Sequence, residues 1–462
     1  MTSSGSELDT SKEEPKTTDH DTTPAHSYPE GGLRAWGVVL AAFGIMLSVY
    51  GPINSAAVFE LHLREHQLSG YSHERIGWIF SLYLFTLYFA GLLIGPVFDR
   101  HGHRLLVLSG SLCIVAGAML FSLSSRKKGS NFTSTSYFIS SRLMSTIGYY
   151  QFVLSFSILG GLGGALLNSP SYAVIGHYFF KRRGFATGVA ATAGGIGGII
   201  FPLILRSTLP SPEGLGFGWS VRILGFILLA ILATSNLILF CLTRSNTNSH
   251  HPPPKRSDSA RPDLRVFRDP RFSLCCAGIF LMEYGVLIPL TYIMSYATAH
   301  GMSAASSYKL PALLNAGSVA GRVIPGIAAD RLGRFNTLIA TVGGCALSVL
   351  ALWLPARDSQ PLLVAFTVLL GFASGGNVSL IPVCIGQICE TRHYGRYLST
   401  AMLLAGFGTL TGIPIGGALL GLRESVRWDA LILFSGLSYL ASFLCYAAAR
   451  VLAVGWDPRV VY

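Results

Sequence analysis

Two charged segments of nearly the same design carry the clearest chemical signal in this sequence. Residues 95–104 read Gly-Pro-Val-Phe-Asp-Arg-His-Gly-His-Arg, and residues 326–334 read Gly-Ile-Ala-Ala-Asp-Arg-Leu-Gly-Arg. Both follow the pattern G-x-x-x-D-R-x-G-x-R, except that the second copy lacks the residue before its last arginine. A carboxylate at a helix end can accept hydrogen bonds from arginines or from a helix N-terminus of a neighbouring bundle. Such contacts can form in one state and break in another.

The two segments therefore predict gates, and a simpler alternative stays open. In that alternative the charges only mark the inner face of a membrane protein, and the glycines only make turns. The recurrence favours gating, because a positive inner face does not require the same spacing twice. The expected gating residues are Asp99, Arg100, Arg104, Asp330, Arg331 and Arg334.

A solute-binding role is expected where a charged residue interrupts an apolar run. Arg322 lies in such a run, and an arginine inside a membrane is costly unless it faces a cavity or a partner. Asn315, Ser318 and Arg322 are three and four residues apart, on one face of a helix. We expect this face to line a pore, with Arg322 binding an anionic or polar group of a solute. The alternative is a structural arginine bound to backbone carbonyls.

Glu283 is the only carboxylate well inside any apolar run. An isolated buried carboxylate tends to hold a proton, so Glu283 is a candidate proton carrier, or a partner for Arg322. The alternative is a solvated position near the inner third of the membrane. Further polar groups fall within apolar runs, and several are expected only to pair helices: Tyr50, Asn54, Asn168, Tyr292, Asn377 and Gln387.

The composition places these residues in a membrane protein. The chain has 462 residues, a mean hydropathy of +0.51 and 12% charged residues. Soluble domains carry about 25% charged residues, and a water-soluble fold could not bury this much apolar surface. Most apolar spans are long enough to cross a hydrocarbon core of about 30 Å. The twelve expected spans are 36–58, 76–98, 105–124, 150–175, 184–205, 219–243, 271–297, 307–329, 336–356, 361–389, 396–421 and 428–452.

Lysine and arginine predict the orientation of these spans. With both termini in the cytoplasm, the basic loops 99–104, 181–183, 244–270, 330–335 and 390–395 are all inside. The loop 125–149 is basic yet predicted outside, and it is either a tolerated insertion or an artefact of the gene model. It contains Asn131-Phe132-Thr133, a glycosylation acceptor that is either modified or unused.

A Pro-rich basic segment divides the spans into six and six. The expected organisation is a disordered cytoplasmic tail (1–30), a six-helix bundle (31–243), a cytoplasmic linker (244–270), a second six-helix bundle (271–453) and a cytoplasmic C-terminus (454–462). The fold class is thus an all-α membrane protein with twelve transmembrane helices in two six-helix halves.

Other functional classes find little support in the sequence. The Gly-rich stretches 160–164 and 194–198 have no strand context and no following Walker lysine, and they match small-xxx-small helix packing instead. The eight cysteines show no zinc spacing. No run alternates basic and aromatic residues in a polar context. We therefore expect no cofactor, no metal, no nucleic-acid partner and no enzymatic activity. The expected partners are a small organic solute and membrane lipid, together with protons if transport is proton-coupled.

With motif, position and repeat in agreement, the chain resembles the major facilitator superfamily. Two further stretches narrow the resemblance to the monocarboxylate porter family and its fungal branch. Glu30-Gly31-Gly32 with Ala35-Trp36 resembles that family's [D/E]-G-G-x-x-A-W signature. The segment 178–188 resembles Y-F-x-K-R-R-x-x-A-x-G at the start of the fifth helix.

The resemblance implies a central cavity beside the first and seventh helices, and it favours Asn54, Tyr284 and Tyr292 as cavity residues. The sequence departs from the carboxylate carriers at two points. Asn54 stands near the position of their first-helix lysine, and Ser318 stands where they have an aspartate one turn before Arg322. The lysine–aspartate pair is missing, which argues against lactate-type proton symport.

Together these features predict a secondary transporter that moves a small organic solute by alternating access. An organic acid or a secondary metabolite is the favoured solute, with export and proton coupling as open options. Uptake of a monocarboxylate or riboflavin is the first alternative. A transporter-like nutrient sensor is the second, although it would need a larger cytoplasmic output region. The plasma membrane is the default location. The sequence fixes neither the solute, nor its direction, nor the oligomeric state.

Overall fold

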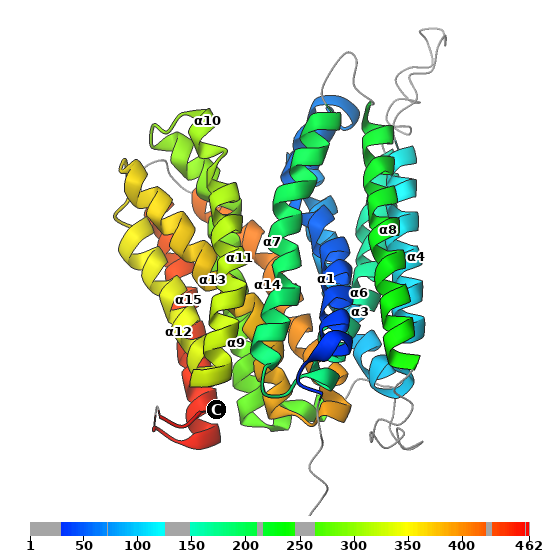
Figure 1. Cartoon of the computed structure of the whole chain (residues 1–462). Helices are drawn as coiled ribbons and strands as arrows, with labels where there is room; N and C mark the ends of the chain where they lie inside the picture. The colour runs from blue at the N-terminus through cyan, green and yellow to red at the C-terminus, as the bar shows by residue number, and fades with distance from the viewer. Residues whose placement is uncertain are drawn as a thin grey trace, which may run out of the picture.

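The chain folds into long helices that run roughly parallel to one another (Figure 1). The computed structural model describes residues 29–71, 73–124, 148–209, 216–244, 264–421, 427–457 and 459–461. Within these residues twelve helices are long and apolar enough to cross a membrane, and none of the described residues forms a strand. The predicted count of twelve spans and the all-α fold class are thereby confirmed.

The first half of the chain supplies six of these helices. They are α1 (Gly32–Asn54), α3 (His73–His101), α4 (Arg104–Leu123), α6 (Gly161–Tyr178), α7 (Arg183–Thr208) and α8 (Gly216–Arg244). A short helix, α2 (Ala56–His62), and a π-helical turn (Leu63–Gln67) follow α1, and a π-helical segment (Val153–Gly160) leads into α6. The first span thus ends four residues earlier than predicted, because the backbone at Ser55 leaves the helical conformation.

The second half repeats the arrangement. Its long helices are α9 (Pro270–Ala299), α11 (Leu310–Leu332), α12 (Arg334–Leu347), α13 (Gln360–Ile388), α14 (Tyr394–Gly421) and α15 (Arg427–Val454). A π-helical segment (Ser348–Trp353) extends α12, and α10 (Ala304–Ser307) is a single turn. Two 3-10 helices, Leu264–Arg268 and Thr391–His393, precede α9 and α14.

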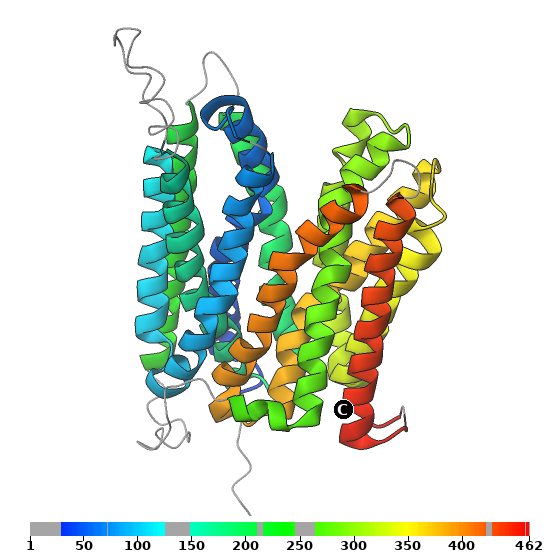
Figure 2. The same ribbon diagram turned by 180° about the vertical axis from the view of Figure 1, so that it is seen from behind.

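The two halves meet along a seam built from four helices. In both views the helices of the first half lie on one side and those of the second half on the other (Figures 1 and 2). Across the seam, α3 packs against α14 and α7 packs against α11. We call the end of the bundle that carries Asp99 and Asp330 the motif end; it is the lower end in Figure 1 and also carries the chain's C-terminus.

Glycines allow the seam helices to approach closely at the motif end. A Cβ atom at Gly326 of α11 would lie 2.6 Å from the carbonyl oxygen of Gly184 in α7. A Cβ atom at Gly95 of α3 would collide with the carbonyl oxygen of Gly395 in α14. The first glycine of each repeated motif is therefore a contact point between the halves, because only a residue without a side chain lets two backbones come this close.

Replacing Gly326 with valine is expected to destabilise the seam. The new side chain would meet backbone that cannot move without shifting a helix, at a cost of roughly 1–3 kcal/mol. The unfolding temperature of the purified protein in detergent should fall by several degrees in a fluorimetric melt. Gly77→Val is the matched control, because a Cβ at Gly77 of α3 meets nothing within 4 Å. Equal melting of the two variants would contradict the close-approach interpretation.

Candidate functional site

The carboxylate of the first motif caps a helix of the other half. Asp99, at the end of α3, accepts hydrogen bonds from the backbone N–H groups of Gly395 (2.8 Å) and Arg396 (2.9 Å) in the first turn of α14. The N–H groups of a first turn have no partner within their own helix, and the helix dipole is positive there. Asp99 therefore satisfies two free donors and places a negative charge where the helix favours it.

The second motif makes the equivalent contact in the opposite direction. Asp330, at the end of α11, accepts hydrogen bonds from the N–H groups of Gly184 and Phe185 in the first turn of α7, both at 2.8 Å. Each half thus supplies a carboxylate that caps a helix of the other half. We call these two contacts the reciprocal caps. They match the expectation of carboxylates bound to helix N-termini of the neighbouring bundle.

The arginines of the two motifs behave differently from one another. Arg334 donates a hydrogen bond to the Phe180 carbonyl across the seam, and its guanidinium lies 5.4 Å from the centre of the Phe180 ring. Arg104 lies over Phe240 of α8, within its own half. Arg100 and Arg331 are exposed at the surface.

Arg100, Arg104 and Arg331 are expected gating residues whose role stays a prediction, because in the described structure they do not contact the opposite half. The reason is helical geometry. Neighbouring residues point about 100° apart, so Arg100 and Arg331 point away from the seam that Asp99 and Asp330 face. Only three of the six expected gating residues contact the opposite half in the described structure, namely Asp99, Asp330 and Arg334.

The second glycine of each motif makes a turn that other residues disfavour. Gly102 has φ +77° and Gly333 has φ +99°. These values lie in the left-handed region, which glycine adopts without the steric cost of a side chain. Each turn separates a cap-bearing helix from the next helix, so the motif spacing is required by the geometry as well as by the charges.

His103, between the two helices of the first motif, keeps a constant charge at ordinary pH. Burial and the neighbouring charge of Arg104 lower the pKa of His103 to about 4. The neutral form therefore dominates above pH 5, and the residue gains a proton only as the pH falls through about 4. A pH response of transport near neutrality would have to come from another group.

Arg183 is a seam residue that the sequence did not single out. It begins α7, is only 3% exposed, and lies with its guanidinium 4.6 Å from the centre of the Tyr394 ring in the other half. One of its nitrogens donates to the Gly386 carbonyl at 3.5 Å, and another, Nη2, has no hydrogen-bond partner among the described residues. In the sequence, Arg183 belongs to the basic segment 181–183. We interpreted that segment only as positive charge on the inner face of a membrane protein.

Glu30 is a second residue whose role sequence reasoning missed. Its carboxylate accepts hydrogen bonds from the backbone N–H groups of residues 180, 181 and 182, at 2.8, 2.6 and 3.2 Å. Trp36 packs edge-on against Phe179 and Phe185, with ring centres 5.5 and 5.4 Å apart. Residues 30–36 and residues 178–188 are the two stretches that resemble the monocarboxylate porter family. They therefore contact each other and hold each other in place. Glu30, assigned to the tail by sequence, is docked against the bundle.

A cavity of about 200 Å³ lies between the halves. It contains one cation, Arg322, and one carboxylate, Glu283, surrounded by tyrosines, amides and apolar side chains. The lining residues come from both halves: Met46, Tyr50, Asn54, Tyr88, Tyr172, Ala191, Gly194, Met282, Glu283, Val286, Leu287, Leu290, Arg322, Ser374, Asn377, Val378 and Tyr439.

Arg322 reaches from α11 toward α7. Its Nη1 donates to the Ala191 carbonyl, and its Nε has no hydrogen-bond partner in the described part of the chain. The arginine therefore binds a backbone carbonyl and also lines the cavity, and its solute-binding role stays a prediction. A guanidinium at a cavity wall is suited to bind a carboxylate or another acceptor group.

Glu283, on α9, lines the same cavity. The Thr409 hydroxyl of α14 donates to its Oε2 at 3.4 Å, a weak contact. The described structure shows no ion pair between Glu283 and Arg322, so a direct partnership of the two is not seen in this state. A carboxylate in a membrane cavity without an ionic partner fits the proton-carrier hypothesis.

The remaining expected solute-binding residues divide between the cavity and helix contacts. Asn54 lines the cavity, and its amide donates to the Gly194 carbonyl at 2.7 Å. Tyr284 is bound to Thr411 at 2.9 Å, and Tyr292 lies against Gly416, so both face α14 outside the described cavity lining. The reason is that Tyr284 follows Glu283 on α9 and so points about 100° away from it.

The expected stripe on α11 also splits. Asn315 lies against Gly198 of α7, on the same side as Arg322. Ser318 is 5% exposed and packs against Gly375 of α13. Neither belongs to the described cavity lining, because the face of α11 is shared between two neighbouring helices that each cover part of it.

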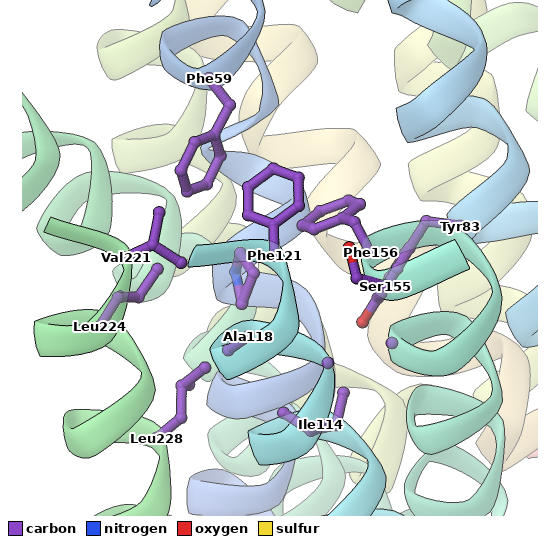
Figure 3. A pocket seen from close by; sticks show the side chains of 13 residues that line it. Phe59, Tyr83, Ile114, Ala118, Phe121, Ser155, Phe156, Val221, Leu224 and Leu228 are labelled. Carbon is purple, nitrogen blue, oxygen red and sulfur yellow. The ribbon is translucent and has the colours of Figure 1, made fainter. Parts of the chain in front are cut away.

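A second pocket, in the first half, is too small and too apolar to be the site. Figure 3 shows the rings of Phe59, Phe121 and Phe156 beside aliphatic side chains of α8. Its volume is about 30 Å³, and no charged side chain lines it. The Tyr83 hydroxyl at its edge already donates to the Val49 carbonyl at 2.8 Å. We interpret this pocket as a packing gap within one bundle.

Comparison with known proteins agrees with the geometry. The family model described as Major Facilitator Superfamily matches residues 36–358 and 326–459. The chain is 36% identical to "Riboflavin transporter MCH5" of Saccharomyces cerevisiae, over 93% of this chain and 80% of that protein. It is 34% identical to "Fujikurins efflux protein" of Gibberella fujikuroi, over 94% of this chain and 85% of that protein.

Solved structures show the same fold at low sequence identity. A bacterial homologue of the iron transporter ferroportin, in its outward-facing state, matches with a TM-score of 0.69 and 13% identity, over 90% of this chain and 99% of that one. These matches agree with the superfamily resemblance that the sequence indicated through its repeated motif and its twelve spans. The chain belongs to the major facilitator superfamily and is a multi-pass membrane transporter.

Proposed function

We propose that this transporter moves a small organic solute with an acidic or acceptor group, either an organic acid or a secondary metabolite, by alternating access. The single observation that supports this best is the central cavity, whose lining holds one cation, Arg322, and one carboxylate, Glu283, with no ion pair between them among the described residues. Arg322 binds the solute, and Glu283 carries the proton that couples transport to a gradient. Tyrosine, methionine and aliphatic side chains surround the apolar part of the solute.

The reciprocal caps supply the gate of this mechanism. They hold the motif end closed through Asp99 and Asp330, with Arg334 and Arg183 as further contacts across the seam. Release of both caps lets the halves rock apart at the motif end and opens the cavity toward that end. Symmetry supports the proposal, because two equivalent contacts must open together for the rocking motion to occur.

The direction of transport is proposed as export. The cavity lacks the lysine–aspartate pair of the carboxylate carriers, and much of its lining is apolar, which suits a bulkier metabolite. A relative named as an efflux protein supports this direction, and a relative named as a riboflavin transporter supports uptake as the alternative. Within the superfamily we assign the chain to the monocarboxylate porter branch, supported by the contact between Glu30 and residues 180–182.

We propose the plasma membrane as the location and the cytoplasm as the side of the motif end. The basic residues Lys181, Arg182, Arg265 and Arg268 lie between the long helices at this end, as the positive-inside rule requires. Asn131, the predicted glycosylation acceptor, lies outside the described residues, and so do residues 1–28 of the tail and 245–263 of the linker. These assignments stay predictions.

Removing the two charges of the cavity should separate binding from coupling. We expect Arg322→Ala to reduce transport at least about 10-fold, since hydrogen bonds to charged groups contribute about 1.5–3 kcal/mol. Glu283→Gln should preserve solute exchange and abolish stimulation by a proton gradient. The measurement uses vesicles reconstituted with the purified protein, with labelled lactate, riboflavin and a larger aromatic acid tested in turn.

The controls are Arg206→Ala and Glu65→Gln, which change exposed residues of the same types. Both should transport like the wild type. The proposal fails if Arg322→Ala transports at the wild-type rate, or if Glu283→Gln keeps its full response to the gradient. A folded protein that moves none of the solutes would favour the sensor alternative.

Neutralising the caps should open the motif end. Each cap is expected to contribute about 0.5–2 kcal/mol, so Asp99→Asn with Asp330→Asn should raise opening several-fold. Cys384 is 1% exposed in α13, within electrostatic range of Arg183 and Arg334, so its reaction with a maleimide reports the opening. Arg331→Gln is the matched control, because Arg331 is exposed and lies outside the seam. Unchanged labelling of Cys384 in the double variant would contradict the gate.

A further inference from the structure

The guanidinium of Arg183 lies at a point where helices of both halves meet. In the first half, a Cβ atom at Gly176 of α6 would lie 2.8 Å from Nη2 of Arg183. In the second half, a Cβ atom at Gly386 of α13 would collide with the same nitrogen. The ring of Tyr394, which begins α14, has its centre 4.6 Å from the guanidinium carbon. We call the space enclosed by Gly176, Gly386 and Tyr394 the arginine slot.

The slot is fitted to a guanidinium. Arg183 is buried, although it stands at the first position of α7 and follows the exposed Arg182. Its head group finds room because neither Gly176 nor Gly386 has a side chain. The flat face of the guanidinium is covered by the Tyr394 ring, an arrangement that attracts a cation to an aromatic face.

The positive charge in the slot is weakly compensated. The Nη1 atom of Arg183 donates to the Gly386 carbonyl at 3.5 Å, and Nη2 has no hydrogen-bond partner among the described residues. No carboxylate in the described part of the chain forms an ion pair with this guanidinium. A buried cation without an anionic partner is costly, and an aromatic ring offsets only part of that cost. The slot therefore favours an anionic group whenever one can reach it.

The slot lies between the motif end and the central cavity. On α6, Tyr172 lines the cavity one helical turn from Gly176. On α13, Val378 lines the cavity eight residues before Gly386. At 1.5 Å per residue, the slot is about 6–12 Å from the cavity along these two helices. Because α6 belongs to the first half and α13 to the second, a solute that moves between the halves from the motif end to the cavity passes the slot.

The present partners of Arg183 hold it only while the motif end is closed. Gly386 and Tyr394 belong to the second half, whereas Arg183 belongs to the first. Separation of the halves at this end removes the carbonyl and the ring together. The guanidinium then faces the opened path, where a new acceptor can replace both.

We propose that Arg183 is a binding point for the anionic group of a solute on its way from the motif end to the cavity. This rests on the proposed function, in which an acidic solute enters from the cytoplasm and is exported. One guanidinium suits one carboxylate or a similar singly charged group. The anion takes the place of the Gly386 carbonyl and the Tyr394 ring, and it is then passed to Arg322.

Closure reverses this exchange. When the halves meet again at the motif end, Tyr394 covers the guanidinium and an anion loses its partner there. The solute is thereby left with Arg322 as its cationic contact in the cavity. The alternative role for Arg183 is a seal that only fills space between the halves, and the two roles differ in their dependence on charge.

Thiol reagents of different charge test whether the slot attracts anions. Tyr394→Cys, in an otherwise cysteine-free full-length protein, uncovers the guanidinium and places a thiol beside it. Asp99→Asn with Asp330→Asn opens the motif end of the same protein. The measured quantity is the ratio of labelling rates for anionic 2-sulfonatoethyl methanethiosulfonate and neutral 2-hydroxyethyl methanethiosulfonate. Arg183→Gln should lower this ratio about 5-fold or more, because a positive charge beside the thiol is lost.

Two variants and a second reporter complete this experiment. Arg182→Gln removes the exposed neighbouring charge and should change the ratio less than about 2-fold, because solvent screens it. Arg183→Lys keeps the charge and should restore most of the ratio. If Tyr394→Cys folds poorly, the native Cys389 serves as the sole cysteine, since it follows Gly386 by three residues and lies on the same side of α13.

Benzoate tests the class of ligand directly. A carboxylate bound in the slot shields the thiol from the neutral reagent. With an affinity of about 1 mM, benzoate at about 10 mM occupies about nine-tenths of the sites, so labelling should slow about 3-fold or more. Benzamide has the same ring without the charge and should not protect, and neither should sodium chloride at equal ionic strength. Arg183→Gln should abolish the protection by benzoate.

Three results overturn the proposal. The first is an equal effect of Arg183→Gln on both reagents, because Arg183 would then only fill space. The second is protection by benzamide as strong as that by benzoate. The third is an introduced thiol that stays unreactive with both reagents after the caps are removed, since no solute could then reach the slot. Failure of the transport assay is a separate result, because a slot that binds benzoate in a protein that moves no tested solute refutes the proposed solute class alone.

Discussion

The arrangement depends on a carboxylate that caps a helix of the opposite half. Asp99 and Asp330 satisfy backbone donors that α14 and α7 cannot satisfy themselves. This contact requires the helices to approach closely, which explains the glycines at 95 and 326. It also brings Arg183 into the seam. Because both caps lie at one end, that end is where the halves are locked together.

The central cavity is organised by buried charges and not by helix caps. There both charges of the cavity, Arg322 and Glu283, lie on the second half, and polar side chains from both halves surround them. Charges and hydroxyls inside a membrane are costly without partners, so their environment is energetically significant. A cavity that lies between the halves therefore places the proposed solute contact where movement of the halves would change its surroundings.

Much of this could be predicted from sequence, and the limit has a physical reason. Hydropathy located the twelve spans, and the repeated motif identified Asp99 and Asp330. The gating roles of Arg100 and Arg331 stay predictions, because adjacent residues of a helix face different directions and these two side chains are exposed here. The cavity residues Tyr88 and Tyr172 were not recognised, since they come from helices whose packing no spacing in the sequence reveals.

The most direct test of the seal is a distance measured between the halves at the motif end. Spin labels at the exposed positions His101 and Arg331, in a cysteine-free background, report this distance by pulsed electron paramagnetic resonance. If the reciprocal caps hold the end closed, the wild type gives mainly the short distance, and Asp99→Asn with Asp330→Asn adds a longer population. An unchanged distribution in the double variant would show that other contacts close this end and would contradict the account.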